Sequence, residues 1–202
     1  TEIENGQLSP ADALADADGV VISPGFGQRG TEGKIQVAEY CRENDVPTLG
    51  ICFGLQMMTI EYARHVAGLD GAHSTEVDED TPHPVIDVMP EQADVEQKGG
   101  TMRLGGYPAE LVAGTRVHEM YGQDEVSERH RHRYEVNPGY HDELRDAGLT
   151  LSGFSPGGTL VEYIELDDHP FYVGTQAHPE FTSRLERPNP LYQGFVDAVL
   201  DR

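Results

Sequence analysis

The chain has 202 residues, enough to bury one core, and we expect a single domain over residues 1–202. Its 36 acidic residues against 14 lysines and arginines give a formal net charge of −22, which excludes nucleic-acid binding through phosphate neutralisation. No apolar run approaches the ~20 residues that cross a bilayer, so we expect no membrane partner. The near-absence of lysine beside so much acid predicts a protein from a high-salt cell, where screening shortens charge repulsion.

The chain contains two cysteines, Cys41 and Cys52, too few for a disulfide scaffold. A reducing compartment is the simplest interpretation, and no charged-then-apolar leader opens the sequence. We therefore expect a soluble, cytoplasmic protein. Because the chain begins at Thr1 rather than at a methionine, we also expect the natural polypeptide to extend further N-terminally.

Strand and helix patterns alternate in the first third of the chain. Short apolar strands are predicted at residues 19–23 and 46–51, and helices at residues 9–17, 31–44 and 53–68. Strands that alternate with helices in this way predict a parallel α/β sheet.

The second half of the chain is richer in strand patterns. Strands are predicted at residues 128–136, 150–154, 159–166 and 170–177, and helices at residues 138–148 and 189–200. Between the two halves lie an acidic loop at residues 76–84 and a glycine-rich loop at residues 98–106.

Cys52 lies where an apolar strand pattern meets a helix pattern, between Gly50 and Gly54. A residue on such a sharp turn projects from the end of the sheet, and flanking glycines relieve the crowding, so the pattern predicts a nucleophile elbow. The backbone N–H of Phe53 and the first helical turn face the thiol, and we expect them to favour a thiolate. Cys41, in the middle of a helix pattern, is instead interpreted as a buried apolar residue.

A thiol nucleophile needs a base, and the base needs an orienting partner. His178 follows the last strand pattern, and Glu180 lies two residues further on, across Pro179. Residues two apart in an extended chain point to the same side, so Glu180 can hold the imidazole in one tautomer. An isolated pair of this kind is usually a surface pair, but behind a cysteine elbow it is the best candidate for the rest of a triad.

Two other patterns carry no site. His130 and His132 have ligand-like spacing, but no third ligand accompanies them, so we predict no metal site. The glycine-rich loops contain no Walker sequence, because Lys34 is followed by Ile35 and not by serine or threonine, and we expect no ATP site on this chain.

The segments LGICFGLQ around Cys52 and HPEF from His178 resemble the triad-type class I glutamine amidotransferases. GAHSTE, TPHPVID, GGTMRLG and ERHRHRYEVNP are similar, more narrowly, to the C-terminal glutaminase domain of the CTP synthase family. The resemblance runs over residues 18–200. It implies a flavodoxin-like three-layer α/β fold, with a mostly parallel central sheet, helices on both faces and a small antiparallel flap.

The resemblance also implies roles for eight residues. In the catalytic triad, Cys52 attacks the carboxamide carbon of L-glutamine, His178 moves protons and Glu180 orients the histidine. The backbone N–H groups of two residues form the oxyanion hole: Phe53 and Gly25. Three side chains hold the glutamine: Gln56, Glu76 and Arg133.

The resemblance implies that ammonia passes to a synthetase domain absent from this chain, which aminates UTP to CTP with ATP and magnesium. No cofactor is implied here, GTP is implied as an allosteric activator, and the full-length protein is implied to be a homotetramer. The family begins this domain with a further strand and helix, so we expect this chain to be N-terminally truncated.

Family members carry Pro-Gly-Gly where this chain has Ser23, Pro24 and Gly25. Proline has no N–H to donate, so we expect Gly25 to serve the oxyanion hole through a small backbone shift and the glutaminase to survive. Two alternatives remain: a non-catalytic regulatory or interaction module with an impaired hole, and a glutaminase subunit of another amidotransferase.

Overall fold

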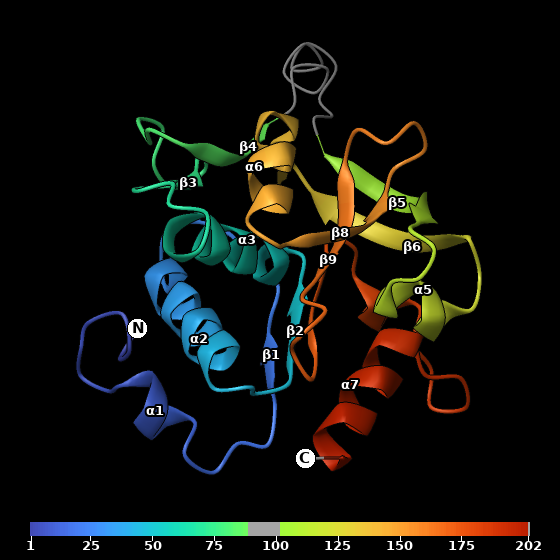
Figure 1. Ribbon diagram of the computed structural model, residues 1–202, viewed down its shortest axis with the longest axis horizontal. Coiled ribbons are helices and arrows are strands. Elements are labelled where there is room, and N and C mark those ends of the chain that lie inside the picture. The colour runs from blue at the N-terminus through green and yellow to red at the C-terminus, as the bar shows by residue number, and fades with distance from the viewer. Residues whose placement is uncertain (89–101, 202) are drawn as a thin grey trace.

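The computed structural model describes residues 1–88 and 102–201 (Figure 1). Within these ranges the largest element is a seven-stranded sheet with the order β1-β2-β10-β9-β8-β5-β6. Its strands are β1 (Val20–Ile22), β2 (Thr48–Ile51), β5 (Arg103–Leu111), β6 (Glu125–His132), β8 (Thr150–Phe154), β9 (Val161–Glu165) and β10 (Tyr172–Thr175). A smaller sheet contains β3 (His73–Ser74), β4 (Pro84–Val88) and β7 (Tyr134–Val136).

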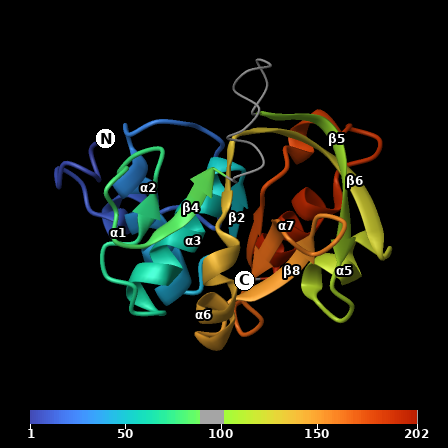
Figure 2. The ribbon, with the colours of Figure 1, turned by 90° about the horizontal axis from the view of Figure 1, so that it is seen from above.

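Helices cover both faces of the large sheet. The helices of the described residues are α1 (Pro10–Ala13), α2 (Thr31–Glu43), α3 (Phe53–His65), α5 (Arg116–Tyr121), α6 (His141–Asp146) and α7 (Pro190–Leu200), with 3-10 turns η2 (Pro138–Tyr140) and η3 (Pro179–Phe181). Helices α2 and α3 lie on one side of β2, and α5 and α7 lie on the other (Figure 2). Side chains alternate along β10, so Tyr172 packs into the core under α3 and Val173 into the core under α7. The expected three layers are present.

The sheet is less parallel than expected. Strands β1, β2 and β10 pair in parallel, whereas β10, β9, β8, β5 and β6 pair antiparallel in succession. The prediction of a mostly parallel sheet is therefore wrong for this half of the molecule, although the α/β class is right. A parallel pair needs a long crossover, so the short connections from β8 to β9 and from β9 to β10 leave those strands antiparallel. In the smaller sheet β3 pairs in parallel with β4, and β4 pairs antiparallel with β7.

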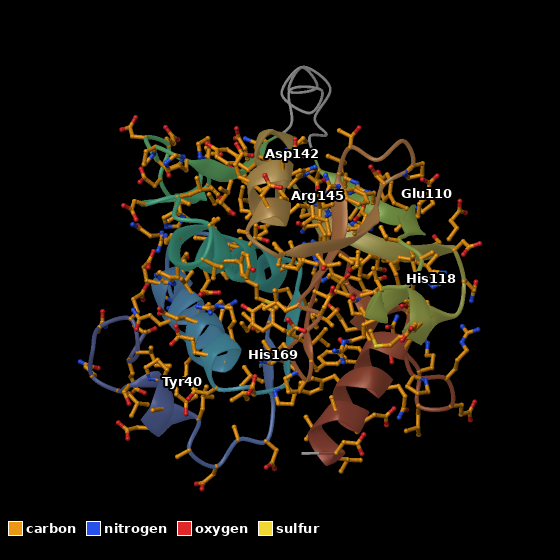
Figure 3. The ribbon with its side chains drawn as sticks, viewed as in Figure 1. Tyr40, Glu110, His118, Asp142, Arg145 and His169 are labelled. Atoms are coloured by element: carbon orange, nitrogen blue, oxygen red, sulfur yellow. The ribbon has the colours of Figure 1, made fainter. Side chains whose placement is uncertain are left out.

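Most predicted elements are present with shorter ends, but the strand expected at residues 128–136 is divided. Arg133 interrupts it, so that β6 belongs to the large sheet and β7 to the small one. Strand β5 was not expected, because its glycines indicated a loop over residues 98–106. Residues 103–106 of that segment belong to the strand. Residues 98–101 fall outside the described residues. On the outer surface of α6, Arg145 pairs with Asp142 at 3.6 Å (Figure 3). No helix in the described parts of the chain has the length and apolar character needed to cross a bilayer.

Candidate active site

Cys52 lies on a strained turn between β2 and α3. Its backbone adopts φ 52° and ψ −103°, in a region that residues with a side chain rarely occupy. Its N–H donates to the carbonyl of Thr175 at 2.7 Å, which ties the turn to the end of β10. This is the geometry of the predicted elbow, and it places the cysteine at the carboxyl ends of the parallel strands.

The two glycines beside Cys52 are explained by close packing. A Cβ on Gly54 would overlap the carbonyl oxygen of Ile22 in β1, and one on Gly50 would overlap the sulfur of Met58 in α3. The first turn of α3 therefore lies against two parallel strands with no space for a methyl group. That approach keeps the elbow in place.

The thiol of Cys52 is only 4% exposed. Burial raises its pKa to about 12, the charges of Glu135, Glu180 and Glu76 raise it as well, and a hydrogen bond from the Phe53 N–H lowers it. The expected resting thiolate is therefore wrong: loss of solvation outweighs the helix N-terminus, and the side chain is a thiol at neutral pH. Attack by this sulfur would require a base to remove its proton.

His178 is held from three sides. Its Nδ1 lies 2.6 Å from Glu180 Oε1, its backbone N–H donates to the Arg129 carbonyl at 2.7 Å, and its ring stacks on Phe181 with centroids 5.1 Å apart. Its Nε2 is buried and has no hydrogen-bond partner among the described residues. The carboxylate thus fixes the tautomer and leaves Nε2 available for proton transfer.

A pocket of about 520 Å³ gathers these groups. Of the eight residues predicted to form the site, seven line it: Gly25, Cys52, Phe53, Gln56, Glu76, Arg133 and His178. Glu180 is the eighth; it is not among the lining residues and contacts His178 through Nδ1 of the ring. Segments far apart in the sequence, from β1 to η3, therefore contribute to one site.

The three residues predicted to hold glutamine come from three segments of the chain and line the pocket together. Gln56 donates from Nε2 to the Tyr134 carbonyl at 3.0 Å, and Glu76 Oε1 accepts from the Gly27 N–H at 3.1 Å. Arg133 occupies the break between β6 and β7 and is exposed. A carboxylate and a guanidinium therefore line one pocket, an arrangement suited to a zwitterionic ligand.

Lys34 lies next to the site, although no sequence pattern singled it out. Its Nζ donates to the Ser23 carbonyl at 2.7 Å and lies 5.0 Å from the centroid of the Phe53 ring. It thereby ties the loop that contains Gly25 to the start of α3 and brings a positive charge near the sulfur. The rarity of lysine was the one feature of the sequence that could have drawn attention to Lys34, since the only other lysine in the chain is Lys98.

His130 and His132 form a buried pair at the pocket, which His132 helps to line. His130 Nδ1 and His132 Nε2 lie 2.8 Å apart, and His132 Nδ1 lies 3.2 Å from the Tyr134 carbonyl. Burial lowers the pKa of both rings, that of His130 to about 3. The two rings satisfy one another as neutral groups, which explains their spacing without a metal.

Cys41 takes the apolar role expected of it. It is 0% exposed in α2 and is not part of the pocket lining. Nε2 of His169 (Figure 3) lies 3.1 Å from its carbonyl oxygen, and His169 Nδ1 accepts from the Phe171 N–H, so Nε2 carries the proton and donates. This bond joins the end of α2 to the turn before β10.

Known proteins share both the sequence and the fold. The family model for class-I glutamine amidotransferase matches residues 2–198. The chain is 57% identical over 183 residues to a CTP synthase of Methanocaldococcus jannaschii and 60% identical over 187 residues to one of Roseiflexus castenholzii, alignments that cover 91% and 92% of it. It spans 34% of the length of each of these relatives.

Solved structures of amidotransferases have a similar fold. The Trypanosoma brucei CTPS glutaminase domain with bound acivicin has a TM-score of 0.88 and 36% identity, over 94% of this chain and 74% of that one. A glutamine amidotransferase of Thermotoga maritima, at 16% identity and a TM-score of 0.53 over 94% and 79% of the two chains, shares the fold alone.

A strained cysteine turn at the carboxyl ends of parallel strands and a histidine that a carboxylate orients line one pocket, an arrangement suited to acyl transfer. With the family match, the chain belongs to the class-I glutamine amidotransferases. Within that family it groups with the glutaminase domains of CTP synthases.

Proposed function

We propose that this chain hydrolyses L-glutamine to glutamate and ammonia through a thioester on Cys52. One observation carries the proposal: the buried thiol on its strained elbow and the unpartnered Nε2 of His178 line the same pocket, while Glu180 holds Nδ1. Nucleophile, base and orienting carboxylate are the three parts that acyl transfer needs.

The charges of the pocket give glutamine one orientation. Arg133 would bind the α-carboxylate through its planar fork, and Glu76 would accept from the α-ammonium group. The side-chain carboxamide then extends towards Cys52. The volume of about 520 Å³ falls within the range usual for sites of small ligands.

The reaction begins from a thiol, because burial raises the pKa of Cys52. As the sulfur attacks the carboxamide carbon, His178 Nε2 takes the thiol proton, and the tetrahedral oxyanion would be held by the N–H groups of Phe53 and Gly25. His178 returns the proton to the leaving nitrogen, ammonia departs and the thioester remains. Water then attacks the thioester with His178 as base, which releases glutamate and restores the thiol.

The ammonia would be consumed by a synthetase domain of the same polypeptide. The relatives that bear the name CTP synthase are about three times as long as this chain, which supports a further domain that aminates UTP to CTP. ATP and magnesium would bind to that domain, GTP would activate the enzyme, and the whole protein would be a cytoplasmic homotetramer. The salt-adapted source stays a prediction from charge alone.

An electrophilic glutamine analogue tests the proposal. Trypsin releases Cys52 in residues 43–64 and Cys41 in residues 35–42, so mass spectrometry separates the two thiols. We expect one adduct, on residues 43–64, together with ammonia release from glutamine. Both should be lost in Cys52→Ala and retained in Cys41→Ala, the matched control.

Two results would contradict the proposal. Ammonia release by Cys52→Ala would show that another group is the nucleophile. A wild-type chain that neither reacts with the analogue nor turns over glutamine would favour the non-catalytic module, for which Pro24 in the pocket lining is the supporting feature.

A further inference from the structure

Gln176 is a fully buried polar residue at the site that no sequence pattern singled out. It follows β10, two residues before His178, and is 0% exposed. Its backbone N–H donates to the Glu162 carbonyl at 2.9 Å, which fixes the main chain at this point. Its side-chain Nε2 lies 3.6 Å from the sulfur of Cys52.

A backbone carbonyl decides which end of the Gln176 amide faces that sulfur. Gln56 Nε2 lies 3.0 Å from the Tyr134 carbonyl oxygen, which can only accept, so this end of Gln56 must be its NH₂ group. The same NH₂ group lies 3.3 Å from the Gln176 side chain and donates to it. Gln176 therefore turns Oε1 towards Gln56 and has its own NH₂ group towards the sulfur.

We infer that Gln176 is a further catalytic residue, whose amide donates a hydrogen bond to the Cys52 sulfur and stabilises the thiolate as it forms. The inference rests on the proposed function, because it concerns the same nucleophile. An N–H bond to an ionised sulfur is stronger than one to a thiol, so the contact favours the attacking form over the resting form. It acts beside the Phe53 N–H, from a different element of the fold.

The donor is preorganised. The Gln176 side chain has no exposed surface, and its oxygen is occupied by Gln56, so no reorientation is needed when charge develops on the sulfur. The arrangement also limits Gln56. Both hydrogens of its amide are committed, to Tyr134 and Gln176, and its Oε1 is the part that remains to accept from a substrate.

The variant Gln176→Glu tests the NH₂ donor of residue 176 without changing the length of the side chain. The variant keeps the length of the side chain and an acceptor for Gln56, but it replaces the NH₂ group that faces the sulfur with a carboxylate oxygen. We would measure the second-order rate of Cys52 alkylation by iodoacetamide between pH 6 and 10, following residues 43–64 by mass spectrometry. Because the pKa of the thiol lies above this range, a further rise lowers the thiolate fraction at every pH measured. We therefore expect the rate to fall about tenfold or more across the whole profile.

A second variant and a control separate catalysis from folding. Gln176→Met removes the donor without adding charge and should lower the same rate by a smaller factor, while Gln193→Met, on the exposed surface of α7, should leave it unchanged. Thermal unfolding shows which variants are folded. If folded Gln176→Glu has the wild-type pH profile, the inference is overturned.

The alkylation assay requires no glutamine, so it does not depend on the proposed function. A lowered profile in a chain that fails to release ammonia supports the donor role and contradicts the glutaminase. An unchanged profile in a chain that does release ammonia contradicts the donor role alone.

Discussion

Glu180 Oε1 lies 2.6 Å from His178 Nδ1, across Pro179 at the start of η3. The bond is short, as expected between an imidazole and a carboxylate, and it leaves Nε2 as the nitrogen without a hydrogen-bond partner among the described residues. In the proposed reaction the bond would have two effects: it would hold one tautomer, and it would stabilise the imidazolium formed when the thiol is deprotonated.

Glu180→Gln should therefore lower kcat for glutamine by about 100-fold or more, with a small effect on KM, because the ring can then adopt the wrong tautomer. Ammonia release under saturating glutamine measures this. Glu186→Gln, an exposed carboxylate in the loop after η3, is the matched control and should retain wild-type turnover. Turnover of Glu180→Gln within a few-fold of wild type would remove Glu180 from the triad.

Gly54→Ala should destabilise the protein, although alanine is ordinarily the better helix former. The added methyl group would overlap the Ile22 carbonyl and push α3 away from β1, at a cost of about 1–3 kcal/mol in the free energy of unfolding. Urea denaturation gives this value. Gly106→Ala is the control, since its Cβ would meet only Ser127 Oγ at 3.6 Å. A Gly54→Ala variant as stable as wild type would show that the contact is not restrictive.

Pro24→Gly tests the oxyanion hole. Pro24 and Gly25 both line the pocket, and only Gly25 has an N–H to donate. If Gly25 is the donor, the substitution should change glutamine turnover by less than about threefold, whereas gaining a missing donor would raise it by about 100-fold or more. A large gain in kcat would show that the donor position belongs to residue 24 and that the natural chain is impaired.

The buried histidine pair should make stability depend on pH. Burial, and secondarily the charge of Arg103, lowers the pKa of His130 from 6.5 to about 3. Between pH 6.5 and pH 3, His130 is therefore protonated in the unfolded chain but neutral in the native chain. This stability is fully present above pH 6.5 and is lost as the pH falls towards 3. Each such histidine contributes a slope of up to about 1.4 kcal/mol per pH unit.

Urea denaturation at pH 7, 6 and 5 measures the effect. His130→Gln should be less stable than wild type at pH 7. Its free energy of unfolding should nevertheless fall less steeply on acidification, because glutamine takes up no proton when the chain unfolds. Equal slopes for the two proteins would mean that His130 is protonated in the native state.

The sequence by itself determined the local features of the site. Gly50 and Gly54 around Cys52 indicated a turn with no space for side chains, and the structure explains both by direct overlap with neighbouring atoms. The two-residue spacing of His178 and Glu180 likewise predicted their contact, although the structure makes it across the 3-10 turn η3 and not along the extended chain that was expected. Both predictions depend on a few adjacent residues, whose relative positions are fixed mainly by their covalent connection along the chain.

Only the tertiary structure decided how distant segments combine. The amide of Gln176 meets a sulfur 124 residues earlier, Arg133 divides one predicted strand between two sheets, and the second half of the large sheet is antiparallel. The resting state of Cys52 was decided in the same way, because its pKa is set by burial beneath segments from the whole chain. Hydrophobic periodicity specifies which face of an element is buried, but strand partners and desolvation arise only when the faces pack together.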